Sequence, residues 1–172
     1  MYYIIFIILV LILIINKYNY EFFNINIKKR GMVKYTYNDF FDEDLSFFNI
    51  NKPINVNHTD NISPDQNVKN ISYKYITEYV PTKTGNYSFR LQSKNASYLY
   101  VNDLLVVDNG GIHSLQEKTG NIYLFAGEIY KIKVYYGNNI GKSFLKFLWK
   151  KPSDYFYSED LSSFIPPIVK YK

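Results

Sequence analysis

The stretch that decides the fold runs from Pro81 to Gly111 and reads PTKTGNYSFRLQSKNASYLYVNDLLVVDNGG. Apolar and polar side chains alternate over 87–91, which is the period of a β-strand with one buried face. Small polar residues at 93–97 predict a turn, after which 98–101 and the apolar run 104–107 are further strand candidates. The pattern predicts a β-meander of three short strands on tight turns.

Similar alternation occurs on both sides of this segment. Strands are expected at 31–37, 54–57, 71–80, 121–126, 129–136 and 144–149, with a polar loop at 112–120, a hairpin loop at 137–141 and a last strand or short turn within 160–172. No helical apolar period occurs after Ile15. The regular spacing of short strands therefore predicts an all-β antiparallel sandwich or barrel. Its buried core is expected to include Phe89, Leu99, Ile132, Val134 and Trp149.

Composition argues against several classes of function. The 172 residues suffice for one domain with a sizeable core and a short extra segment. The net charge of +5 is mild and no basic stripe interleaved with aromatic residues occurs, so we expect no nucleic-acid partner. The chain has no cysteine, which excludes disulfides and thiolate metal sites. We expect no enzymatic activity, because the sequence has no Gly-x-Ser-x-Gly elbow, no phosphate-binding Gly-x-x-x-x-Gly-Lys-Ser loop and no His-Glu-x-x-His motif.

The N-terminus carries an unbroken apolar run, from Tyr2 through Ile8 to Ile15. As a helix it would reach about 21 Å, against a hydrocarbon core of about 30 Å. We interpret residues 1–16 as a hydrophobic helix that anchors the chain in a membrane, and residues 17–30 as a stalk. A cleaved signal peptide is an alternative, although a basic leading region and a small-residue cleavage site are missing. A buried core segment is a further alternative.

The order of the motifs resembles the fourteen-kilodalton protective-antigen (PA) domain, a family named after the anthrax protective antigen. The resemblance rests on four features: Thr-Gly-x-Tyr-x-Phe at 84–89, Tyr-Leu-Tyr-Val-Asn-Asp at 98–103, the strand pair around Ala126-Gly127, and a late strand that ends in Trp149. It covers roughly 28–172 and is strongest over 72–152. The resemblance implies a PA-type β-sandwich over residues 31–172.

Lectin members of this family hold calcium through two adjacent aspartates in a turn that is matched here by Lys94-Asn95. A second loop, matched by 137–143, supplies an Asn side chain and backbone carbonyls. This chain keeps an Asn at 138 but lacks both aspartates, and calcium prefers several anionic oxygen ligands. We therefore expect no cofactor and no metal, calcium included. The candidate ligand-binding residues in these loops are Lys94, Asn95, Asn138, Asn139 and Ile140.

Two signals bear on the side of the membrane that the domain occupies. Basic residues follow the apolar run, which favours a cytosolic domain under the positive-inside rule. Five glycosylation sequons favour the opposite side, if the domain reaches a secretory lumen. They lie at Asn57, Asn61, Asn70, Asn86 and Asn95. Because the resembled domains mostly work outside cells, we expect a single-pass membrane protein whose domain is extracellular, lumenal or on a virion surface.

The sequence thus leaves two hypotheses for function. In the first, the chain is a membrane-anchored binding module that recognises glycan or protein ligands through the loops of a β-sandwich. In the second, it is a structural envelope or virion component that makes protein–protein contacts and binds no sugar. The missing acidic pair favours the second hypothesis, and the retained Asn138 loop favours the first.

Overall fold

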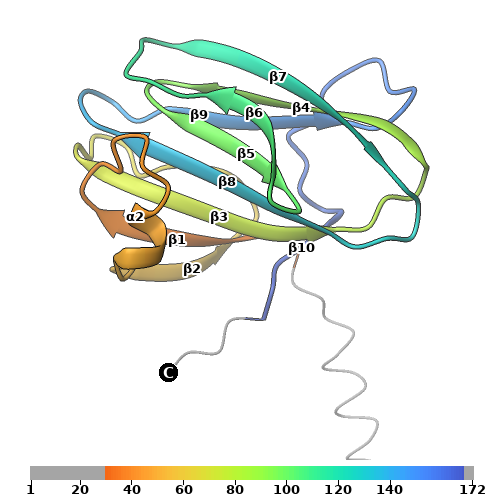
Figure 1. Ribbon diagram of the computed structural model, residues 1–172, viewed down its shortest axis with the longest axis horizontal. Helices are drawn as coiled ribbons and strands as arrows, with labels where there is room; N and C mark the ends of the chain where they lie inside the picture. Colours follow the sequence, from red (N-terminus) through yellow and green to blue (C-terminus); the bar gives the residue numbers. More distant parts are fainter. Residues whose placement is uncertain (1–29, 169–172) are drawn as a thin grey trace, which may run out of the picture.

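The computed structural model describes residues 30–168, which form a sandwich of two antiparallel β-sheets (Figure 1). The elements are β1 (Met32–Asn38), α2 (Phe47–Ile50), β2 (Asn55–Thr59), β3 (Ile71–Tyr79), β4 (Gly85–Ser93), β5 (Ser97–Val101), β6 (Leu104–Asn109), β7 (Gln116–Leu124), β8 (Tyr130–Asn138), β9 (Leu145–Lys150) and β10 (Phe164–Ile165). The larger sheet has the order β2-β1-β3-β8-β5-β6, with β10 paired to β3, and the smaller sheet has the order β7-β4-β9. The predicted all-β antiparallel sandwich is confirmed.

The predicted N-terminal anchor, with Tyr2, Ile8 and Ile15, lies outside the described residues, as does all of the predicted stalk except Arg30. Within 30–168, no helix is both long and apolar enough to cross a membrane.

The core lies between the two sheets and is rich in aromatic side chains. On β8, Tyr130, Ile132, Val134 and Tyr136 face inward, as the alternation predicts. The five predicted core residues are all buried: Trp149 is 4% exposed, and Phe89, Leu99, Ile132 and Val134 are 0% exposed. The indole Nε1 of Trp149 donates a hydrogen bond to the Asp160 carbonyl at 2.9 Å, so the polar atom of this buried ring has a partner.

The predicted meander over 81–111 is wrong, although its three strands exist. β4 belongs to the smaller sheet, whereas β5 and β6 form a hairpin in the larger sheet. The predicted hairpin loop at 137–141 is wrong for the same reason, because β8 and β9 lie in different sheets. Alternation shows which face of a strand is buried. Strands of both sheets bury the face that points to the shared core, so the pattern does not show sheet membership.

The segment 116–120 was predicted as loop but belongs to β7. β7 pairs with β4 over nine positions, from Gly85–Leu124 to Ser93–Gln116. It is an edge strand with mostly exposed side chains, so its first half needs no apolar alternation. Gly120 packs so closely on the Val106 carbonyl that a Cβ would collide with it. This contact joins the two sheets along β6 and β7.

α2 was also not predicted, and with the preceding loop it covers part of the outer face of the larger sheet. Phe41 and Phe48 pack there on Tyr37, Tyr98 and Tyr135, and the rings of Phe48 and Tyr135 lie 4.9 Å apart. Outward-facing aromatic residues of β1, β5 and β8 are thereby removed from water.

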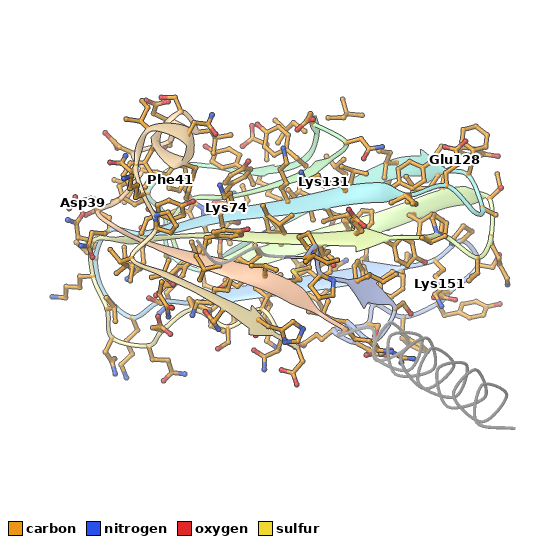
Figure 2. The ribbon with its side chains drawn as sticks, turned by 90° about the horizontal axis from the view of Figure 1, so that it is seen from below. Asp39, Phe41, Lys74, Glu128, Lys131 and Lys151 are labelled. Carbon is orange, nitrogen blue, oxygen red and sulfur yellow. The ribbon has the colours of Figure 1, made fainter. Side chains whose placement is uncertain are left out.

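Strand directions give the sandwich two ends. At the distal end, β1, β4, β6 and β8 finish, and the loops 65–70, 94–96, 110–115 and 137–144 meet. At the proximal end, the chain enters β1 at Gly31, and the loops 80–84, 125–129 and 151–157 gather. Figure 2 shows Asp39 and Phe41 at the distal end and Glu128 and Lys151 at the proximal end.

Candidate functional site

Two of the predicted ligand residues meet at the distal end and bind each other. Asn95 Nδ2 donates to Asn138 Oδ1 at 3.0 Å and to the Ile140 carbonyl at 3.4 Å. The two side chains are 3% and 0% exposed. Asn95 has a φ of +62°, a left-handed conformation that Asn adopts more readily than most residues. The Lys94–Asn95 turn and the 137–144 loop are therefore joined through a buried amide pair.

A third loop is tied to the same pair. Asn138 Nδ2 donates to the Val68 carbonyl at 2.7 Å and to the Gly141 carbonyl at 3.1 Å. Ser143 Oγ donates to the Val68 carbonyl at 3.3 Å. Neither Val68 nor Ser143 was among the candidate residues predicted from the sequence. A backbone carbonyl leaves no signature in a sequence, and Val68 lies 70 residues away from Asn138.

A fourth loop joins through the backbone, and a serine pair extends the network. Asn95 N donates to the His113 carbonyl at 3.0 Å. The hydroxyls of Ser93 and Ser97 are hydrogen-bonded at 2.8 Å, Ser93 Oγ donates to the Asn95 carbonyl at 2.8 Å, and Asn109 Nδ2 donates to Ser93 Oγ at 2.8 Å. Buried polar networks rigidify a structure where their members are satisfied, and among the described residues Asn109 Oδ1 is the one buried side-chain atom of this network without a partner. The distal loops therefore have a fixed relative arrangement.

The other predicted residues lie at the surface around this network. Lys94 and Asn139 are partly exposed, and Ile140 is 64% exposed. Ile112 and Leu115 of the 110–115 loop are 58% and 49% exposed. The distal surface thus combines aliphatic side chains with an ammonium group and an amide.

The residues of this turn do not fit calcium. The side-chain N–H groups of Asn95 donate to Asn138 Oδ1 and to the Ile140 carbonyl. A cation bound between these two loops would need the same two oxygens as ligands. The N–H dipole stabilises those oxygens as a cation would, but it carries no full charge. Over residues 30–168, no group of three or more His, Cys, Asp or Glu could hold a metal ion.

The sequons occupy different environments. Asn61, Asn70 and Asn86 are exposed on the surface, and Asn57 is partly buried on β2. Asn95 is buried in the network above, so its amide is not accessible in the folded domain.

Comparison with known proteins places this geometry in context. A family model, that of the PA14 domain, matches residues 28–160. Among curated protein sequences there is no match. The fold is similar to that of an anti-sigma factor domain-containing protein from Clostridium clariflavum, with a TM-score of 0.68 and 22% identity. That match covers 84% of this chain and 49% of the other, so this chain spans about half the length of that protein.

Two smaller proteins of known structure are matched over almost their whole length. A PA14 sugar-binding domain from an RTX adhesin has a TM-score of 0.68 and 14% identity, with 79% of this chain and 97% of the other covered. The A domain of epithelial adhesin 6 from Candida glabrata, solved with Galβ1-3GlcNAc, has a TM-score of 0.63 and 13% identity, with 86% and 95% covered. At these identities the similarity concerns the fold.

Proposed function

Because the chain belongs to the PA14 domain family, we propose that it is a binding module that recognises glycans through its distal loops without calcium. The observation that carries this proposal is the buried Asn95–Asn138 pair, which holds four loops together. Similarity in fold to a sugar-binding domain and to an adhesin domain solved with a disaccharide supports the ligand class.

The network prepares the distal surface for binding. Loops that are already fixed lose little conformational freedom when a ligand binds, which lowers the entropic cost of association. Lys94 and Asn139 offer a cationic donor and an amide at the rim, and Ile140 offers an apolar contact. A few convergent polar groups beside apolar surface are typical of small-ligand sites. In this proposal the sugar hydroxyls bind Lys94 and Asn139, and a C–H face of the sugar packs on Ile140.

Calcium independence follows from the same pair. Family lectins use two aspartates where this chain has Lys94 and Asn95. Here the Asn95 amide already bonds Asn138 Oδ1, and the Lys94 ammonium would repel a cation in this turn.

A glycan array probed with the purified chain tests this proposal. We expect binding to at least one class of glycan, with the same signal in the presence of a chelator. Replacing both Lys94 and Asn139 by Ala should lower the signal, because it removes the two polar groups at the rim. The matched control replaces Thr82 and Lys83, both exposed at the proximal end, by Ala. Loss of binding in chelator would contradict the calcium-free mechanism, and equal loss in the control would contradict the location of the site.

We also propose that residues 1–16 anchor the chain as a single-pass membrane helix, with 17–30 as a stalk and the domain outside the cell, in a lumen or on a virion surface. The apolar run in the sequence and the exposed sequons at Asn61 and Asn86 support this arrangement. Endoglycosidase treatment of the full chain from a eukaryotic host tests it. An unchanged mobility, together with protease sensitivity on the cytosolic side of sealed vesicles, would contradict the orientation.

The second candidate function is that of an envelope or virion component that contacts other proteins and binds no sugar. The exposed aliphatic side chains of Ile112, Leu115 and Ile140 at the distal end favour it. Replacing Ile112 and Leu115 by Ser distinguishes the two functions. Loss of a co-purifying protein, with an empty glycan array for the unmodified chain, would support the structural function.

A further inference from the structure

Several large apolar side chains at the proximal end are exposed to solvent and are not part of the core. Tyr123, at the end of β7, and Phe125 are each 53% exposed, and Ile129 is 65% exposed; the last two lie in the turn between β7 and β8. Tyr155 and Phe156, in the loop after β9, are 92% and 86% exposed. Single exposed apolar residues are common, but a group of them at one end of a domain indicates an interaction surface.

Backbone hydrogen bonds hold both loops in place. In the first loop, Gly127 N donates to the Pro81 carbonyl at 2.9 Å, and Ala126 N donates to Thr84 Oγ1 at 2.9 Å. In the second loop, Asp154 N donates to the Lys151 carbonyl at 3.2 Å. The rings of Tyr123 and Phe125 pack edge to face with centroids 5.4 Å apart. The apolar side chains are therefore displayed by an ordered scaffold.

Basic residues also lie in the proximal half of the domain. Arg30, Lys83 and Lys131 are exposed, and Lys150 and Lys151 are partly exposed. Four acids at this end offset part of that charge: Glu78, which pairs with Lys131 across β3 and β8; Asp160, whose pKa is lowered by hydrogen bonds from Ser162 and further by the charges of Arg30 and Lys151; Glu128; and Asp154. Glu128 Oε2 accepts a hydrogen bond from the Tyr130 hydroxyl at 3.1 Å, and Asp154 Oδ2 accepts one from Lys151 N at 3.2 Å. Aromatic tips and cations at one end match the lipid–water interface, where rings lie at headgroup level and Lys and Arg attract anionic lipids.

The chain also enters the domain in this half of the sandwich. Gly31 N donates to the Phe164 carbonyl at 3.0 Å, and Phe164 pairs with Tyr79 at the end of β3. In the sequence, Gly31 follows Lys28-Lys29-Arg30 and, further back, the apolar run 2–15. Fifteen residues separate Ile15 from Gly31 and span at most about 50 Å when extended. A bilayer that holds the run would therefore lie within reach of the proximal end.

We propose that the proximal end is a membrane-contacting surface that binds the headgroup region of an anionic bilayer. Phe125, Ile129, Tyr155 and Phe156 lie among the headgroups, and the lysines at this end bind lipid phosphates and carboxylates. The Glu128 carboxylate, in the turn between Phe125 and Ile129, limits the contact to this shallow depth because a carboxylate is costly in hydrocarbon. The distal loops then point away from the bilayer (Figure 2). This proposal rests on the membrane anchor proposed for residues 1–16, but it does not depend on the ligand of the distal loops.

Depth-dependent fluorescence quenching in the full chain tests this surface. The chain has no native cysteine, so Phe125→Cys and the matched Ile140→Cys each give one labelling site. Both positions are exposed and apolar, but they lie at opposite ends of the domain. Each variant carries an environment-sensitive fluorophore and is reconstituted with phosphatidylcholine–phosphatidylserine vesicles that contain lipid spin-labelled near the glycerol backbone. We expect a blue shift and strong quenching for the label at 125, and neither for the label at 140. Equal quenching at the two positions would overturn the proposal.

A second set of variants tests which side chains carry the contact. With the label at Tyr155→Cys, replacing Phe125 and Ile129 by Ser should lower the fraction of quenched label about tenfold or more, because it removes two apolar groups from the interface. The matched control replaces Ile112 and Ile140 by Ser at the distal end and should leave quenching unchanged. Vesicles of phosphatidylcholine alone should quench less than anionic vesicles. Undiminished quenching in the proximal variant would overturn the proposal. So would a concentration-dependent blue shift without lipid, which would assign this surface to self-association.

Discussion

The two ends of the sandwich are held together by different kinds of interaction. At the distal end, amides and hydroxyls are buried, and the residues that hold the loops bind one another. At the proximal end, an aromatic cluster of Tyr79, Trp149 and Phe164 fills the interior, and further rings remain in water. The four distal loops therefore depend mainly on hydrogen bonds, although the aromatic cluster of Phe41 and Phe48 also packs at that end, whereas the proximal interior depends on packing. Directed bonds fix loop positions relative to one another, as a ligand site requires, whereas close packing tolerates variable loops above it.

The largest expected effect concerns the packed end. Trp149 contacts Tyr79 and Phe164 with ring centroids 5.2 Å and 5.0 Å apart. We expect Trp149→Ala to lower the free energy of unfolding by about 3–5 kcal/mol, since it leaves a large cavity. Urea denaturation followed by circular dichroism measures it, with Lys83→Ala, exposed at the same end, as a control of small effect. A loss below about 1 kcal/mol would show that the proximal core is not the main source of stability.

The next effect concerns the hydrogen-bonded end. Asn138→Ala removes one acceptor for Asn95 and two bonds to the carbonyls of Val68 and Gly141. We expect a cost of about 2–4 kcal/mol, because buried polar groups lose partners. The control is Asn139→Ala, next to it and partly exposed, at below about 0.5 kcal/mol. Equal costs for the two variants in urea denaturation would mean that the network does not stabilise the distal end.

A smaller effect tests the link between the network and calcium. Calorimetric titration of calcium into the unmodified chain should give no heat of binding. The double variant Lys94→Asp with Asn95→Asp supplies two carboxylates beside Asn138, and it should bind calcium with Kd near or below about 10⁻³ M. At tenfold excess of calcium over Kd, this variant should be stabilised by about 1.4 kcal/mol. Micromolar binding by the unmodified chain would show that the wrong turn was matched to the aspartate pair.

The pKa values of two tyrosines should be shifted in opposite directions from the ordinary value. Burial raises the pKa of Tyr136, on the distal half of β8, from its ordinary value of 10.0 to about 12, although hydrogen bonds with Phe144 and Ser143 lower it in part. For Tyr157, partial burial acts upward, but the Ser88 hydroxyl and the Arg90 charge lower its pKa overall. Absorbance at 295 nm should show that Tyr157→Phe removes an early ionisation and Tyr136→Phe a late one. Because the folded pKa of Tyr136 is raised, its contribution to stability is complete below pH 10 and is lost as the pH rises through about 12. The same ionisation profile for both variants would contradict this assignment.

The smallest expected effect concerns the exposed proximal rings. Tyr155→Ser and Phe156→Ser should each change the free energy of unfolding by less than about 0.5 kcal/mol, because the rings are 92% and 86% exposed. Thermal melting without lipid, beside Trp149→Ala, measures the difference. A large loss would mean that these rings stabilise the fold rather than serve a surface function.

The alternation of apolar residues predicted the faces of β3, β8 and β9 and the buried positions of Phe89, Ile132 and Trp149. These features are local, since a period of two residues shows which side of a strand avoids water. A local pattern does not show to which sheet β4 belongs, because the buried face of β4 would suit either sheet. The cover over Tyr37 and Tyr135 depends on α2, whose four residues are too few for a helical period.

At the candidate site, the turn at Lys94–Asn95 meets the loop at Asn138, the two segments that the family resemblance assigned to one site. The resemblance did not predict that Asn95 and Asn138 bind each other, because side-chain partners depend on the positions of loops far apart in the sequence. The role of Val68 was beyond any sequence pattern, since only its carbonyl is used.

The hydrogen bond between Gly31 and Phe164 has a further consequence. The first and last strands of the sandwich, β1 and β10, pair one after the other with the edge of β3 opposite to β8, and so bring the two limits of the domain together. A unit whose limits adjoin can be inserted into a loop of a host protein, or circularly permuted, without stretching either chain. A permutant that joins residues 168 and 30 through a short linker, and opens at the exposed Lys52, should retain the native fold.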